Sequence, residues 1–181
     1  MATGAAYYYY TSKDAIVMDF YRRACDEMQE SIRLGLEGVE NLENGLSALI
    51  RVKLTHFGSN REVLRALLRN GADPKYPLSP FGAETKRIRG LDIAWFQQLI
   101  RQAAVRVPRD LTPHLPGVLW FFQMGVILFW VTDDSPRQSR TERLLPLACK
   151  AVSSLIKVSS FPLKRPLRRP VLDVIKIVVG E

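Results

Sequence analysis

Apolar residues recur at intervals of three and four along most of the chain, and this spacing places them on one face of an α-helix. The first such pattern begins after Ser12, whose hydroxyl is suited to cap the free amides of a helix, and runs to Ile32. Gly35 and Gly38 then weaken the pattern. The sequence therefore predicts one long amphipathic helix near its beginning.

The same spacing continues in segments that are separated by glycine, asparagine and proline. The predicted helices span about 42–57, 61–70, 83–105, 116–132 and 138–158, with a short last helix near 169–178. Asn60 is suited to cap the helix that ends at Asn70, and two prolines predict a loop over 75–82. No segment alternates apolar and polar residues over a convincing length, so we expect an all-α fold.

The stretch LPGVLWFFQMGVILFWVT, residues 115–132, is almost wholly apolar. A membrane-spanning helix needs roughly 20 apolar residues. This stretch is shorter, contains Gln123 and ends at Asp133-Asp134. We therefore expect a buried or interface helix, and no membrane partner.

The composition is that of a folded chain, because 47% of its 181 residues are hydrophobic. The net charge is +8, but residues 1–80 hold 10 basic and 10 acidic residues, so the excess lies in residues 81–181, with 16 basic and 8 acidic. The basic segment 164–170 is interpreted as a solvated link. Cys25 and Cys149 form neither a disulfide framework nor a metal-binding spacing, and they fit a reducing cytoplasmic compartment.

No catalytic set stands out in the sequence. There is no nucleophile motif and no glycine-rich loop for phosphate, and His56 and His114 are isolated from other metal ligands. We expect no enzymatic activity, no cofactor and no metal site.

Four consecutive tyrosines, Tyr7 to Tyr10, lie between Gly4 and the helix start at Ser12. This combination resembles the end of the DNA-binding domain in the tetracycline repressor (TetR) family, with the pattern Gly-x-x-Tyr-Tyr-x-Phe-x-Ser/Thr-Lys-Glu-x-Leu. Tyr10 stands where the family usually has Phe. The long helix that follows and the two long helices near the end are also similar to the family, so the resemblance is compact over residues 4–17 and diffuse beyond.

The resemblance implies a remnant of a helix-turn-helix domain over residues 1–12, a connecting helix over 13–37, and a ligand-binding and dimerisation domain over 38–181. The residues that it implies for DNA contact are Thr3, Gly4, Tyr7, Tyr8, Tyr9 and Lys13. The family has two further helices, about forty residues, before this point, and a reading helix needs them for support. We therefore expect binding to a DNA operator only where those helices are present.

Family members bind a small effector inside the helical domain, and large flat side chains favour an apolar cavity for an organic ligand. The candidate ligand-binding residues are aromatic or apolar residues of the central part of the chain: Phe57, Leu64, Phe81, Trp95, Phe96, Trp120, Phe121 and Met124. Each of them is individually also suited to core packing. Gln97 and Gln123 are the candidates for one polar contact.

The resemblance further implies a homodimer that buries the helices at 116–132 and 138–158. The candidate interface residues are Leu144, Leu147, Ala148, Ala151 and Leu155. The predicted function is thus a cytoplasmic, ligand-responsive transcriptional regulator of the TetR type, with repression as the family habit. The alternative is a helical small-molecule-binding or interaction module that has no DNA role.

Overall fold

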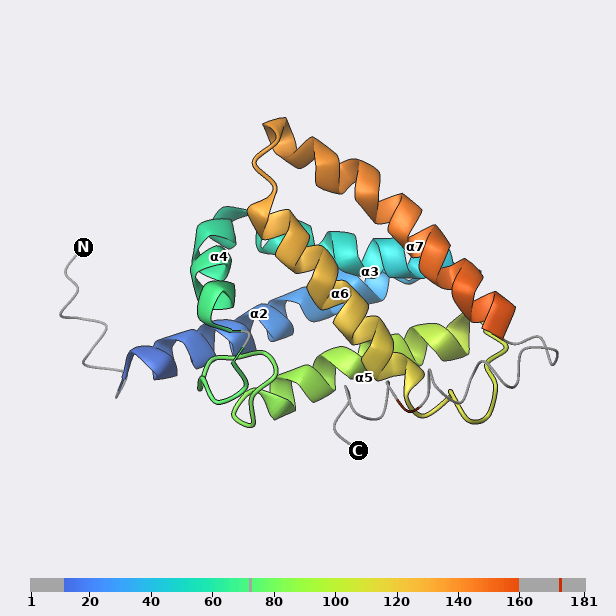
Figure 1. Ribbon diagram of the computed structural model, residues 1–181, viewed down its shortest axis with the longest axis horizontal. Helices are drawn as coiled ribbons and strands as arrows, with labels where there is room; N and C mark the ends of the chain where they lie inside the picture. Colours follow the sequence, from blue (N-terminus) through green and yellow to red (C-terminus); the bar gives the residue numbers. More distant parts are fainter. Residues whose placement is uncertain (1–11, 72, 160–172, 174–181) are drawn as a thin grey trace.

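Helices joined by turns and loops make up the described part of the chain, which comprises residues 12–71, 73–159 and 173 in a computed structural model (Figure 1). The α-helices are α2 (Lys13–Gly35), α3 (Leu42–His56), α4 (Arg61–Asn70), α5 (Lys86–Gln102), α6 (Leu115–Thr132) and α7 (Ser139–Ser159). Short 3₁₀ turns, η1 (Gly58–Asn60) and η2 (Pro136–Gln138), precede α4 and α7. No strand occurs in these residues, and the predicted all-α fold is confirmed. The predicted helix near 169–178 lies outside the described ranges, apart from residue 173.

The helix boundaries follow local capping chemistry at several positions. The Ser12 hydroxyl accepts a hydrogen bond of 3.1 Å from the Ala15 amide, so the predicted cap of α2 is confirmed. The predicted cap at Asn60 is wrong, because this residue lies in η1 and its side chain makes no capping bond to α4. Helix α5 begins at Lys86, after a turn, and is shorter than the segment 83–105 that its apolar pattern predicts.

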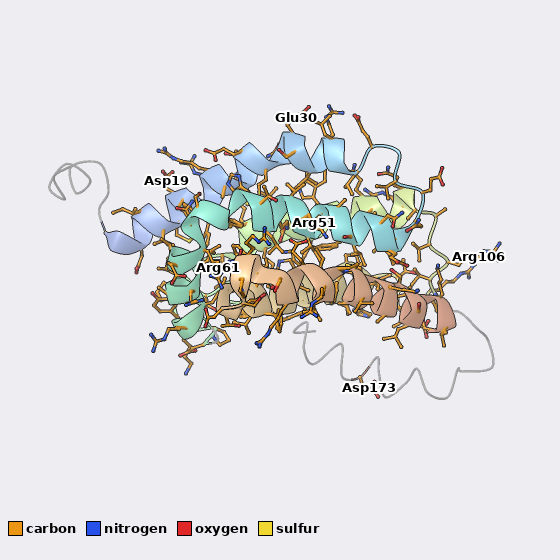
Figure 2. The ribbon with its side chains drawn as sticks, turned by 90° about the horizontal axis from the view of Figure 1, so that it is seen from above. Asp19, Glu30, Arg51, Arg61, Arg106 and Asp173 are labelled. Carbon is orange, nitrogen blue, oxygen red and sulfur yellow. The ribbon has the colours of Figure 1, made fainter. Side chains whose placement is uncertain are left out.

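Helix α3 is the centre of the packing, since it contacts α2, α5, α6 and α7 (Figure 1). Its residues Leu46, Leu49 and Ile50 are buried. Gly45 allows the close approach of α5, because a Cβ at this position would overlap the Leu99 side chain and come within 3.0 Å of Val39 Cγ1. Charged side chains such as Glu30 on α2 and Arg106 after α5 project away from this centre (Figure 2).

Helix α6 is apolar on all sides and packs against α4, α5 and α7. Among the described residues it is the helix that is long and apolar enough to cross a membrane, with a mean hydropathy of 1.7, and 56% of it is buried inside the protein. Its side chains Leu119, Trp120 and Val131 belong to the core. Leu128 and Phe129 are exposed, so part of α6 remains uncovered in the single chain.

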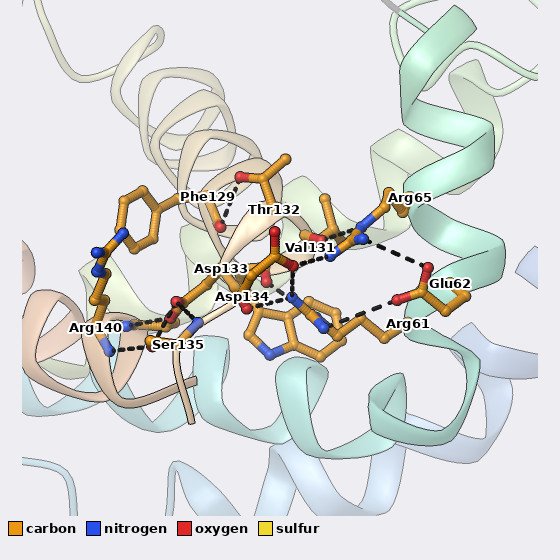
Figure 3. Close-up of polar contacts among 12 residues, drawn as sticks. Arg61, Glu62, Arg65, Phe129, Val131, Thr132, Asp133, Asp134, Ser135 and Arg140 are labelled. Carbon is orange, nitrogen blue, oxygen red and sulfur yellow. Dashed lines mark hydrogen bonds and ion pairs between the residues drawn. The ribbon is translucent and has the colours of Figure 1, made fainter. Parts of the chain in front are cut away.

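Two arginines of α4 bind the end of α6 (Figure 3). Arg61 Nε donates to the Trp130 carbonyl at 3.1 Å, and Arg65 Nε donates to the Val131 carbonyl at 2.6 Å. Arg65 Nη2 also reaches Asp134 Oδ1 at 2.8 Å. Because the last carbonyls of a helix lack partners inside the helix, these guanidinium groups satisfy them and fix α4 against α6.

The turn between α6 and α7 is held by Asp133 (Figure 3). Its carboxylate accepts hydrogen bonds from the Ser135 hydroxyl at 2.6 Å and from the Thr141 amide at 2.8 Å. Burial opposes ionisation of Asp133, but the hydrogen bonds from Ser135 and Thr141 outweigh it and hold the pKa of this carboxyl well below its usual range. The charged carboxylate thereby fixes the direction in which α7 leaves α6.

Candidate ligand-binding site

A cavity of about 110 Å³ lies between α2, α3, α4, α5 and α6. Its wall is mainly apolar. The lining residues are Tyr21, Cys25 and Met28 of α2; Lys53 and Phe57 of α3 and its end; Leu64 and Leu68 of α4; Pro80, Thr85, Ile88, Arg89 and Asp92 before and along α5; and Trp120, Gln123, Met124 and Ile127 of α6. Five helices therefore meet at one small apolar space.

Four of the candidate ligand-binding residues, Phe57, Leu64, Trp120 and Met124, lie on this wall. Phe81 and Phe121 lie beside Trp120 and form an aromatic cluster with it. Their ring centroids are 5.6 and 5.1 Å from that of Trp120, in edge-to-face arrangements. They support the wall from the side and are not among the residues that line the cavity.

The other two candidates lie elsewhere on α5. Phe96 is fully buried in the core. Trp95 lines a separate groove of about 250 Å³ between α2 and α5. The groove and the cavity share residues of the wall, among them Cys25 and Asp92. Of the two glutamines proposed for a polar contact, Gln123 lines the cavity and Gln97 is exposed.

Three polar side chains from three helices meet in the apolar wall. The ammonium group of Lys53 on α3 forms an ion pair with Asp92 Oδ1 on α5. Gln123 Nε2 on α6 donates a hydrogen bond of 2.7 Å to the other oxygen, Asp92 Oδ2. Lys53 also lies 5.8 Å from the centre of the Phe96 ring. These contacts join α3, α5 and α6 at the cavity.

Burial governs the ionisation of the groups around the cavity. It lowers the pKa of the Lys53 ammonium, and the charge of Asp92 beside it opposes that shift. Burial also raises the pKa of Tyr21 to about 12, with a further contribution from Tyr76. The pKa of the Cys25 thiol is raised to about 11, first by burial and then by Asp92. Tyr21 and Cys25 are therefore neutral at physiological pH, and Cys25 is a poor nucleophile there.

Arg89 lies at the edge of the cavity and binds the loop before α5. Its Nη1 donates to the Pro80 carbonyl at 2.7 Å and to the Gly82 carbonyl at 3.1 Å, and its guanidinium lies 5.7 Å from the Trp120 ring centre. Burial lowers its pKa, although a guanidinium remains charged in proteins. Arg89 thus fastens the loop before α5 over the cavity.

The sequence analysis did not assign Lys53 and Asp92 to the site. One signal for Lys53 was present, because a lysine stands among Leu46, Leu49, Ile50 and Leu54 on the apolar face of its helix. Asp92 similarly stands between the apolar residues Leu91 and Ile93. A charged residue at a core position calls for a partner, but the helical period does not say which residue of another helix provides it.

The described part of the chain contains no group of three or more His, Cys, Asp and Glu side chains that could hold a metal ion. His56 is half-buried, and its Nε2 lies 3.6 Å from Glu27 Oε2. His114 is buried at the start of α6. The mainly apolar wall of the cavity is suited to bind a molecule through apolar contact and a few hydrogen bonds.

Comparison with protein families shows to which family the chain belongs. Residues 46–176 match the tetracyclin repressor-like, C-terminal domain. The chain belongs to the TetR family. The matched residues run from the second turn of α3 to beyond α7 and include the α3, α4, α5 and α6 parts of the cavity wall. No curated protein matches the chain.

Membership in the TetR family indicates a regulatory protein rather than an enzyme. Of the residues predicted to contact DNA, Thr3, Gly4 and Tyr7 to Tyr9 lie outside the described ranges, and Lys13 is the first residue of α2. Their role in this TetR-like chain stays a prediction.

The residues predicted for a dimer interface all lie on α7. Leu147 and Leu155 are 67% and 69% exposed, Ala151 is exposed, and Leu144 and Ala148 are half-buried. The opposite face of this TetR-like helix is buried and contains Leu145 and Cys149. Helix α7 thus has an apolar face that the single chain leaves uncovered.

Proposed function

We propose that this chain acts as a ligand-responsive transcriptional regulator in the cytoplasm, with repression as its mode. Residues 38–181, together with α2, bind a small apolar effector, and residues 38–181 form a homodimer. The observation that carries the proposal is the cavity itself, because five helices line it and α2 is one of them. In the sequence, α2 directly follows the segment that resembles the end of a DNA-binding domain.

The cavity favours a small effector. An engineered cavity of about 150 Å³ with apolar walls binds benzene, so a space of this order accommodates roughly one ring. Trp120, Phe57 and Met124 supply flat or adaptable apolar contacts to such a ligand. A larger effector requires movement of side chains or helices around the cavity.

Helix α2 provides the proposed route to DNA. Three residues of this helix lie on the cavity wall: Tyr21, Cys25 and Met28. Two positions of α2 give the cavity two different shapes. A ligand that binds one shape more tightly shifts the equilibrium toward that position of α2. Movement of α2 then changes the position of the segment that precedes it.

The uncovered faces of α6 and α7 support the proposed homodimer. Leu147, Ala151 and Leu155 are exposed on α7, and Leu128 and Phe129 are exposed on α6. Burial of one exposed leucine contributes about 1.5–3 kcal/mol at full coverage. Pairing of this surface with a second copy would remove these side chains from water.

Methionine-methyl NMR on the full chain tests ligand binding directly. Met28 and Met124 line the cavity, and Met18 on the same helix as Met28 does not. A panel of single-ring aromatic molecules should shift the methyl signals of Met28 and Met124 and leave that of Met18 nearly unchanged. Saturable shifts at both lining residues are expected.

A filled-cavity variant makes this test specific. Leu64→Trp places a large ring in the cavity and should abolish the shifts, whereas Val63→Trp changes the exposed neighbour on α4 and should preserve them. Equal binding to wild type and Leu64→Trp, or no shift with any member of the panel, contradicts the proposed effector site.

A further inference from the structure

The carboxamide of Gln123 is the unusual polar group of the cavity wall. The residue is 1% exposed, and it lies on α6 among apolar lining residues. Its Nε2 donates to Asp92 Oδ2, while its Oε1 accepts no hydrogen bond from the described residues. A buried acceptor without a donor carries a free-energy cost, so this oxygen needs an explanation.

The orientation of the amide follows from its partner. The Asp92 carboxylate receives Lys53 at one oxygen and Gln123 at the other. A carboxylate accepts hydrogen bonds, so the amide nitrogen of Gln123 must face it. The ion pair between Lys53 and Asp92 therefore determines that Gln123 turns its oxygen, and not its nitrogen, away from Asp92.

Several other polar groups of the wall have protein partners. Arg89 donates to two backbone carbonyls of the preceding loop, and Thr85 Oγ1 donates to the Ser79 carbonyl at 2.6 Å. The charge of Lys53 is matched by Asp92. The ion pair between Lys53 and Asp92 carries no net charge, so the part of the wall beside Gln123 favours a neutral molecule.

We propose that the effector is a neutral, apolar molecule with one hydrogen-bond donor, a hydroxyl or an N–H group, and that Gln123 Oε1, which is buried in the free chain, accepts this donor once the ligand enters the cavity. This inference rests on the proposed effector site and adds the chemical class of its ligand. Asp92 and Lys53 act as positioning residues, because they hold the Gln123 amide in the orientation that turns its oxygen away from Asp92. The apolar remainder of the ligand contacts Trp120 and Met124.

Two probes of nearly equal shape test the inference on the full chain. 4-Methylphenol has a hydroxyl donor where 1,4-dimethylbenzene has a methyl group. Calorimetric titration should give 4-methylphenol an affinity at least about tenfold higher, since a hydrogen bond to a buried acceptor favours the ligand that supplies the donor. Methionine-methyl NMR locates both probes through Met28 and Met124.

Gln123→Met supplies the matching change in the protein, because it removes the acceptor and keeps a side chain of similar length. The affinity ratio of the two probes should fall to about one in this variant. Met124→Leu, a change in the apolar wall, should alter both affinities together and keep the ratio. Circular dichroism of each variant establishes that it is folded before its titration is interpreted.

The outcomes separate the inference from the proposed function. Equal affinities of the two probes for wild type, or a preference for 4-methylphenol that survives Gln123→Met, overturn the donor assignment and leave the effector site intact. Absence of binding by both probes and by the aromatic panel overturns the effector site and the donor assignment together. Equal affinities of the two probes for wild type overturn the donor assignment even where Gln123→Met fails to fold.

Discussion

Arg65 of α4 donates a hydrogen bond of 2.6 Å to the backbone carbonyl of Val131 at the end of α6. Its neighbour Leu64 lines the cavity. One turn of α4 therefore touches both the candidate ligand site and the helix that leads into the α6–α7 turn. Any displacement of α4 by a ligand acts on the end of α6 through this bond.

Removal of the hydrogen bond from Arg65 to the Val131 carbonyl should lower the free energy of unfolding. Arg65→Met keeps most of the side-chain stem and removes the donors to Val131 and Asp134. We expect a decrease of about 1–2 kcal/mol in the free energy of unfolding, because the Val131 carbonyl is left without this partner. Urea denaturation measures the change. Arg69→Met, at an exposed position of the same helix, should change stability by less than about 0.5 kcal/mol, and equal effects of the two variants would refute the role of Arg65.

The ion pair between Lys53 and Asp92 gives a second prediction. Lys53→Met leaves the Asp92 carboxylate near the core without its cation and should lower the free energy of unfolding by about 2–3 kcal/mol. The figure is below that of a fully enclosed pair, since the Asp92 side chain is 19% exposed. The double variant Lys53→Met/Asp92→Leu should recover most of the loss in thermal or urea unfolding. A double variant that is less stable than Lys53→Met would contradict this account.

The dimer surface is tested by charge insertion. Leu147→Glu places a carboxylate in the uncovered apolar face of α7 and should convert the sedimenting species from dimer to monomer, because a buried charge without a partner is costly. Leu34→Glu is the matched control, since Leu34 is a 52% exposed leucine on α2. A wild-type chain that sediments as a monomer, or a dimer that survives Leu147→Glu, would exclude the proposed surface.

The turn at Asp133 predicts a dependence of stability on acid. The folded state holds the pKa of Asp133 below that of an unfolded aspartate, which is about 4. Its stabilising contribution is therefore fully present above about pH 4 and is lost as the pH falls through the folded-state pKa. Asp133→Asn should be less stable than wild type at pH 7 and should lose less stability on acidification.

Urea midpoints measured between pH 2 and pH 7 would check this behaviour. Asp14→Asn removes an exposed carboxylate at the start of α2 and is the control. The Asp133 assignment fails if Asp133→Asn and Asp14→Asn keep the same pH dependence as wild type.

The positions of most helices were predictable because their determinants are local. The period of apolar residues, the cap at Ser12 and the stop at Asn70 each depend on residues within a few positions of one another. The same local reasoning failed at Asn60, where η1 intervenes before α4 and leaves the side chain without a capping bond.

The candidate site was predictable in part. Trp120 and Met124 were identified as large side chains on an apolar helix, and they line the cavity. Trp95 and Phe96 came from the same reasoning and lie in a separate groove and in the core. Helix α5 is apolar on more than one side, so its pattern alone does not determine which side faces which neighbour.

By itself, the sequence determined that this chain is helical, where most of its helices lie, and that its beginning resembles part of a DNA-binding domain. Tertiary structure alone decided that Lys53 meets Asp92, 39 residues further along the chain, and that Gln123 joins them from α6. The physical reason is range: helical periodicity and capping act within a turn or two, whereas the partners of a buried charge depend on how whole helices pack across the core.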